Sequence, residues 1–154
     1  MDAWGRQRSL ARTTALWGGA SIVAGVVMAG RDDPWWRAFG GQHVGWGAVD
    51  LAIVAAVSGL QRRQLRRLAD PYDPVVLERQ RRKLRIILAV NAVADAGYCV
   101  TGVVLRRRRH RPRAAGAGAA IIIQGAFLLL HDSYHALRST RADLVAAHPP
   151  HRGI

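Results

Sequence analysis

Nine polar or ionisable side chains lie in or beside long apolar runs of this chain, where they could do chemistry. They are His43, Asp50, Asn91, Asp95, Tyr98, Gln124, His131, Asp132 and His135. On a wheel of 100° per residue the polar groups of each run gather on one face, with Asp132 at the edge of its face. A carboxylate within a bilayer costs at least ~2.5 kcal/mol on insertion scales. If the runs cross a membrane, these faces are therefore expected to meet inside a helical bundle.

A buried polar cluster of this kind is compatible with three roles. The leading hypothesis is a protein that binds a small ligand or a partner membrane protein, with polar groups also bonded across helices to fix the packing. A second is a small transporter coupled to protons or another cation, using Asp50 and Asp95. A third is a metal- or haem-binding module, because His131 and His135 have i, i+4 spacing and could offer two imidazoles to one metal. The spacing alone is common, so neither a metal nor a cofactor is predicted.

No catalytic motif accompanies these residues. The sequence has no glycine-rich loop followed by Lys-Ser/Thr, no HExxH, and a single cysteine, Cys99. Ser133 lies between the two histidines of the last run but points off their face. The sequence therefore favours a protein that is not an enzyme.

Four apolar runs carry the polar residues, in a chain of 154 residues that is 50% hydrophobic. Runs of this length can span a bilayer, and in lipid a helix satisfies its own backbone hydrogen bonds. We predict an all-α fold, a compact bundle of four transmembrane helices forming a single membrane domain. The predicted helices cover residues 13–30, 43–68, 75–105 and 114–138.

The segments between the runs differ in length and composition. The basic connection 61–85 has turn residues at 70–74 and helical arms, which predicts a helical hairpin extension between the second and third helices. Tryptophans near the predicted helix ends, Trp4, Trp17 and Trp46 among them, suit the membrane–water boundary. The polar tail 141–154 is expected to fray.

The first run carries small residues on one face: Thr14, Gly18, Ser21, Gly25 and Ala29. Such a stripe lets two helix backbones approach closely. Residues 27–29 also resemble a signal-peptide cleavage site, with a basic segment upstream. The stripe favours a retained, packed helix over a cleaved signal.

The distribution of the 23 basic residues predicts the orientation. With a cytoplasmic N-terminus, 15 lie inside and 8 outside, so the positive-inside rule places both termini in the cytoplasm. The basic segment 106–113 opposes this assignment.

The net charge of +13 raises the question of a partner. The arginine runs flank membrane helices and lack interleaved aromatic residues, so nucleic acid is not predicted. Anionic lipid head groups are the expected partners, in particular of Arg106, Arg107, Arg108 and Arg109. A second copy of the chain or another membrane protein is the alternative partner.

Several short motifs carry a resemblance. Residues 91–98 (NAVADAGY) precede Gly102, and residues 116–118 (GAG) precede 124–129 (QGAFLL) and 132–135 (DSYH). Together with Trp46-Gly47 and Asp50, they resemble an uncharacterised family of small four-helix bacterial integral membrane proteins, a domain of unknown function. The resemblance implies the four-helix fold, a bacterial plasma membrane and a shared polar face. It implies no activity.

Overall fold

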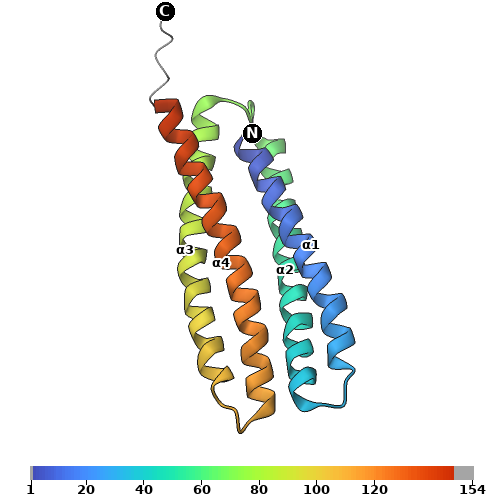
Figure 1. Ribbon diagram of the computed structural model, residues 1–154. Helices are drawn as coiled ribbons and strands as arrows, with labels where there is room; N and C mark the ends of the chain where they lie inside the picture. The colour runs from blue at the N-terminus through green and yellow to red at the C-terminus, as the bar shows by residue number, and fades with distance from the viewer. Residues whose placement is uncertain (1, 148–154) are drawn as a thin grey trace, which may run out of the picture.

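The computed structural model of the chain describes residues 2–147, with side chains as far as Leu137. Over this part the chain forms four long helices and no strand (Figure 1). They are α1 (Ala3–Ala29), α2 (Pro34–Arg67), α3 (Pro74–Arg106) and α4 (Pro112–Ala147). The predicted all-α bundle is confirmed, and so is the helical extension between the second and third helices. The predicted frayed tail 141–154 lies outside the described side chains.

Three helices begin at an aspartate that caps the free backbone N–H groups. The carboxylate of Asp2 accepts a hydrogen bond from the N–H of residue 5, and Asp33 and Asp73 accept from the first turns of α2 and α3. Pro34 and Pro74 follow directly, at the position where a helix has no need of a backbone donor. The short Asp-Pro motifs therefore define where α2 and α3 begin.

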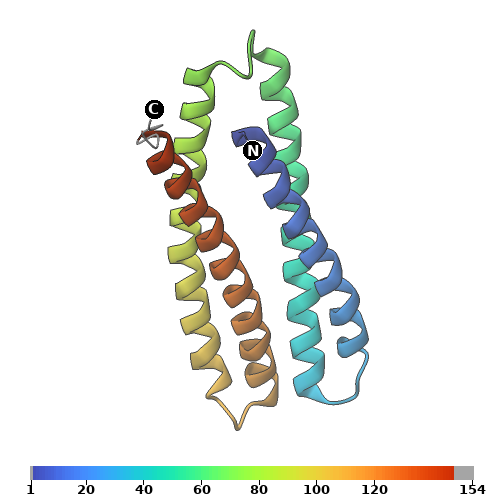
Figure 2. The ribbon, with the colours of Figure 1, turned by 45° about the horizontal axis from the view of Figure 1, so that its top comes forward.

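The bundle consists of two helical hairpins. Helix α1 packs along α2 and α3 packs along α4, while the contact between α2 and α4 joins the hairpins. The start of α1, the end of α4 and the α2–α3 connection lie at one end of the bundle, and the two shorter loops lie at the other (Figures 1 and 2). We call the first of these the connection end.

Glycines allow the helices of each hairpin to approach closely. A Cβ atom at Gly25 would lie 2.7 Å from the carbonyl oxygen of Gly40, and one at Gly102 would lie 2.9 Å from that of Gly118. Gly18 and Ser21 are buried in the same α1–α2 interface. The small-residue stripe on α1 is therefore a helix-packing surface, as its spacing predicts.

At the connection end, the start of α1 is tied to the α2–α3 connection. Trp4 is fully buried and its indole N–H donates to the carbonyl of Pro71 at 2.9 Å. The side-chain amide of Gln61 donates to the carbonyl of Trp4, and that of Gln80 donates to the Gln7 side chain. Of these bonds, the one between Gln80 on α3 and Gln7 on α1 joins the two hairpins at this end.

The outer surface of the bundle is strongly apolar. All four helices are long and apolar enough to span a bilayer, with mean hydropathies of 1.3 to 1.7 over their most apolar windows. Large apolar side chains point outward from them, such as Leu16 at 77%, Val93 at 75% and Leu130 at 71% exposure. A water-soluble protein rarely exposes such continuous apolar surface. The chain is therefore a multi-pass membrane protein.

Candidate functional site

A chain of hydrogen bonds links three helices within the bundle. The indole N–H of Trp17 on α1 donates to Gln124 Oε1 on α4 at 2.7 Å. Gln124 Nε2 in turn donates to Asp50 Oδ2 on α2 at 2.8 Å. Gln124 is 1% exposed and Asp50 is 4% exposed, so the hydrogen bond between them replaces bonds to water. We call these three residues the polar chain.

A column of aromatic rings leads from the polar chain along α4. The Trp17 ring stacks on Phe127 with centroids 4.0 Å apart. Phe127 stacks on His131 at 5.5 Å, and His131 meets His135 at 4.9 Å. The spacing of four residues places the last three rings on successive turns of one helix face.

His131 is held by its neighbour Asp132. Its Nδ1 lies 3.0 Å from Asp132 Oδ1, and both side chains are largely buried. In a neutral imidazole, an Nδ1–H that donates to the carboxylate leaves Nε2 as an acceptor. Nε2 is buried and has no hydrogen-bond partner among the described residues.

A cavity of about 190 Å³ adjoins this pair and is lined by all four helices. Its walls are mostly aliphatic side chains from α1, α2 and α3. Polar groups reach it from three helices: Gln7 and Thr14 on α1, Asn91 on α3, and His131 and Asp132 on α4. The cavity therefore combines an apolar lining with a few hydrogen-bonding groups, as small-molecule sites do. We call it the central cavity.

Asp95 on α3 is half-buried, and its Oδ2 is buried without a partner within the described part of the chain. If Asp95 is ionised, Asp132 repels it most and Asp50 also repels it. Buried acids that lack a partner are exceptional in membrane proteins and mark candidate functional groups.

The remaining predicted site residues lie apart from the central cavity. His43 is buried against the edge of Phe39, with ring centroids 4.7 Å apart. Tyr98 packs edge-on against Trp46 at 4.8 Å. His135 is not among the residues that line the cavity, and its ring contacts that of His131. Of the nine predicted residues, the structure brings Asn91, His131 and Asp132 together at the central cavity and joins Asp50 to Gln124 in the polar chain. His43 and Tyr98 lie apart from both.

The arginine run 106–109 begins at the last residue of α3 and is exposed throughout. Backbone bonds fold it into a tight turn, in which the N–H of Arg108 donates to the carbonyl of Leu105 at 3.1 Å. It lies at the end of the bundle opposite to the connection end (Figure 1). The structure thus separates this run from the arginines of α1 and from those near the end of α2.

Two tryptophans that sequence analysis assigned to the membrane boundary have other partners. Trp17 belongs to the polar chain and Trp4 is buried at the connection end. The sequence does contain a reason to expect such partners, because an indole N–H in an apolar environment needs a hydrogen-bond acceptor. Gln124, on a distant helix, supplies that acceptor for Trp17.

The structure gives no support to a metal centre. Within residues 2–137, no group of three or more His, Cys, Asp or Glu side chains gathers as a metal site requires. His131 and His135 lie with tilted rings on neighbouring turns, and the Nδ1 of His131 is already engaged by Asp132.

Comparison with known proteins gives one match. Residues 13–133 match the model of a family of unknown function, DUF6992. No curated protein and no solved structure matches the chain. The matched region contains the polar chain and the central-cavity residues of α2, α3 and α4. Because the match covers well over half of the sequence, the chain belongs to the family DUF6992, a family of unknown function with the four-helix architecture described above.

Proposed function

We propose that this membrane protein binds a small, mostly apolar molecule in the central cavity, through a hydrogen bond that the molecule donates to His131 Nε2. One observation carries the proposal. His131, whose ring nitrogen Nε2 is buried without a partner among the described residues, is one of the residues that line a cavity bounded by four helices. Leaving a buried polar atom unsatisfied costs about 1–3 kcal/mol, and a ligand that bonds to it recovers part of that cost.

The lining defines the class of ligand. Aliphatic side chains such as Leu10, Ile53 and Leu88 favour an apolar body. The acceptors at His131 and Asp132 favour a hydroxyl or amine donor on that body. At about 190 Å³ the cavity is smaller than the roughly 300–1,000 Å³ typical of drug-sized ligands, so we expect a molecule of few heavy atoms.

Two substitutions of the same histidine test the proposal. His131→Asn retains an amide N–H near the position of Nδ1, which can still bond Asp132, and removes Nε2. His131→Gln places its amide near the position of Nε2 and gives up the bond to Asp132. Native mass spectrometry of the protein purified in mild detergent measures any retained small molecule. We expect a retained adduct in the wild type and the His131→Gln variant, and its loss in the His131→Asn variant.

An adduct retained equally by all three proteins would contradict the role of Nε2. Absence of any small-molecule adduct from the wild type, under conditions that preserve bound lipid, would contradict the proposal as a whole. His135→Phe serves as the control, because it alters the next ring of the column and leaves the cavity lining unchanged.

Asp95 favours a second function, transport coupled to protons or another cation. Its Oδ2 is buried without a partner among the described side chains, and a proton or a small cation can bind there. Asp50 is the companion acid, although Gln124 already bonds to it. In liposomes with a pH gradient, a carrier role predicts proton flux that is lost in Asp95→Asn. Flux no greater than in empty liposomes would exclude it.

We also propose a bacterial plasma membrane as the location. Both termini and the α2–α3 connection would then lie in the cytoplasm. The support is the excess of basic residues on that side. Reporter fusions in the α2–α3 connection near Asp73 and after α4 test it. A periplasmic signal from both fusions would reverse the orientation, and signals from both sides would indicate dual topology.

At the opposite end, we propose that the exposed arginines 106–109 hold anionic lipid head groups. Replacing all four by Gln is expected to weaken cardiolipin retention and to leave membrane insertion intact. Unchanged cardiolipin retention would contradict this role.

A further inference from the structure

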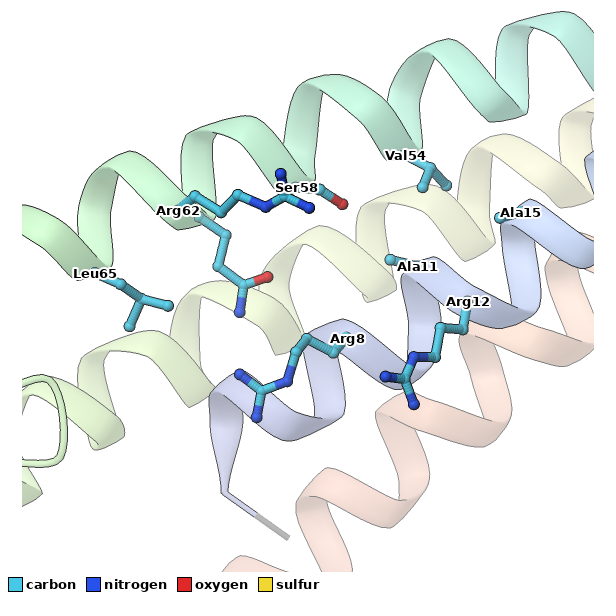
Figure 3. A pocket seen from close by; sticks show the side chains of 9 residues that line it. Arg8, Ala11, Arg12, Ala15, Val54, Ser58, Arg62 and Leu65 are labelled. Atoms are coloured by element: carbon cyan, nitrogen blue, oxygen red, sulfur yellow. The ribbon is translucent and has the colours of Figure 1, made fainter.

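A second cavity opens between α1 and α2 near the connection end, with a volume of about 400 Å³ (Figure 3). Arg8 and Arg12 stand on its α1 side and Arg62 on its α2 side, where the Arg62 side chain extends along the helix beside Ser58 (Figure 3). The lining also includes Gln61 and several apolar residues. We call this the arginine pocket.

The spacing of these residues follows from helix geometry. Arg8 and Arg12 are four residues apart, as are Ser58 and Arg62, so each pair lies on one face of its helix. The antiparallel packing of α1 on α2, set by the contacts of Gly18 with Gly47, brings the two faces to the same level. The three arginines therefore line one pocket although they come from distant parts of the chain.

The arginine pocket lies where the membrane-spanning part of both helices ends. On α1 the apolar run 13–30 begins directly after Arg12, and on α2 the apolar run 44–60 ends just before Arg62. Ala11, Ala15 and Val54 line its apolar side. A pocket with this arrangement offers aliphatic surface toward the lipid tails and guanidinium groups at head-group depth.

The charges of the arginine pocket are not neutralised within the described part of the chain. Arg8, Arg12 and Arg62 are exposed, and no described acidic side chain forms an ion pair with any of them. None of the residues that line the pocket is acidic. Guanidinium groups match phosphate oxygens in charge and in bidentate geometry, and the Ser58 hydroxyl adds a further donor.

We propose that the arginine pocket is a binding site for the phosphate group of an anionic phospholipid, with the lipid's glycerol backbone and upper acyl chains against its apolar side. The proposal does not depend on the ligand in the central cavity. It also differs from the lipid binding proposed at 106–109, which lies at the other end of the bundle.

Lipid titration of the purified, delipidated protein tests the proposal. Native mass spectrometry measures the binding of phosphatidylglycerol, with phosphatidylcholine and inorganic phosphate as separate arms. We expect preference for phosphatidylglycerol over phosphatidylcholine in the wild type, and no displacement by millimolar inorganic phosphate. Removing an arginine from the pocket should weaken binding roughly fivefold, and the triple variant R8Q/R12Q/R62Q on the order of 100-fold.

The matched control is R63Q/R66Q/R67Q, which removes three exposed arginines from the same helix end without touching the pocket lining. It should weaken binding by less than about tenfold, since only the general surface charge changes. The single variant Arg62→Gln keeps the test valid if the triple variant fails to fold. Equal losses in the pocket and control variants would overturn the site. Full displacement by inorganic phosphate would overturn the lipid as its ligand.

Discussion

Two regions of the bundle interior differ in whether their buried polar groups have hydrogen-bond partners. In the polar chain, every buried group has a partner, because Gln124 uses its oxygen for Trp17 and its amide nitrogen for Asp50. Among the described residues, His131 Nε2 beside the lining of the central cavity is buried without one, and so is Asp95 Oδ2 on α3. Within a single helix, α4, the side chains at 124 and 131 thus have contrasting environments.

The contrast distinguishes polar groups that stabilise helix packing from polar groups that are available to bind a ligand or a proton. A satisfied hydrogen-bond chain inside a membrane bundle fixes which helices meet, at a gain of about 0.6–2 kcal/mol for each bond. An unsatisfied group contributes nothing to packing and weakens the fold. The positions where this bundle tolerates such a cost are therefore the positions to examine for ligand or proton binding.

The largest expected effect comes from breaking the polar chain at its centre. Gln124→Leu removes two hydrogen bonds and leaves the Trp17 N–H and the Asp50 carboxylate without this partner. We expect a loss of roughly 2–3 kcal/mol in the free energy of unfolding, measured by denaturant titration in mixed micelles. Leu130→Ala, which trims a lipid-facing side chain, is the control. A loss no larger than that of the control would show that the polar chain does not hold the helices together.

A smaller effect is expected at the end of the polar chain. Trp17→Phe deletes the indole N–H but keeps an aromatic ring to stack on Phe127. Only one bond is lost, so the free energy of unfolding should fall by about 0.5–1.5 kcal/mol in the same assay. In combination with Gln124→Leu, Trp17→Phe should add little, because the partner is already gone. Fully additive losses would contradict the bond between them.

The smallest effect is expected at Asp95. Asp95→Asn keeps the shape of the side chain, and Oδ2 has no hydrogen bond to lose. The free energy of unfolding should change by less than about 0.5 kcal/mol, the range of substitutions that break no specific interaction. A loss above about 1 kcal/mol would mean that Asp95 has a structural partner, and it would place this acid with the polar chain.

Much of the fold could be predicted from the sequence because its signals are local. Uninterrupted apolar runs predict the spans, and the small-residue stripe predicts which face of α1 packs. Each of these depends on residues a few positions apart. The start of α2 at Pro34 lies nine residues before residue 43, where the apolar pattern places it. The physical constraint that lipid imposes on backbone hydrogen bonds then leaves helices as the only choice.

The pairing within the site could not be predicted in the same way. A helical wheel shows that Asp50 and Gln124 face inward, but it carries no information on the depth or rotation of one helix against another. The bond between them depends on the contact of α2 with α4, which lie far apart in sequence. The wheel likewise does not predict that Asp95 is only half-buried, or that Asn91 is exposed and still lines the central cavity.

The most direct test of the central claim is the state of His131 Nε2 itself. Nitrogen-15 NMR of histidine-labelled protein resolves this atom, with the His131→Asn variant providing the assignment. Spectra are compared before and after organic-solvent extraction and reconstitution. If a ligand donates to Nε2, the wild-type signal should report an accepted hydrogen bond as purified and shift toward an unbonded ring nitrogen after extraction. An identical Nε2 signal in both preparations would contradict the account.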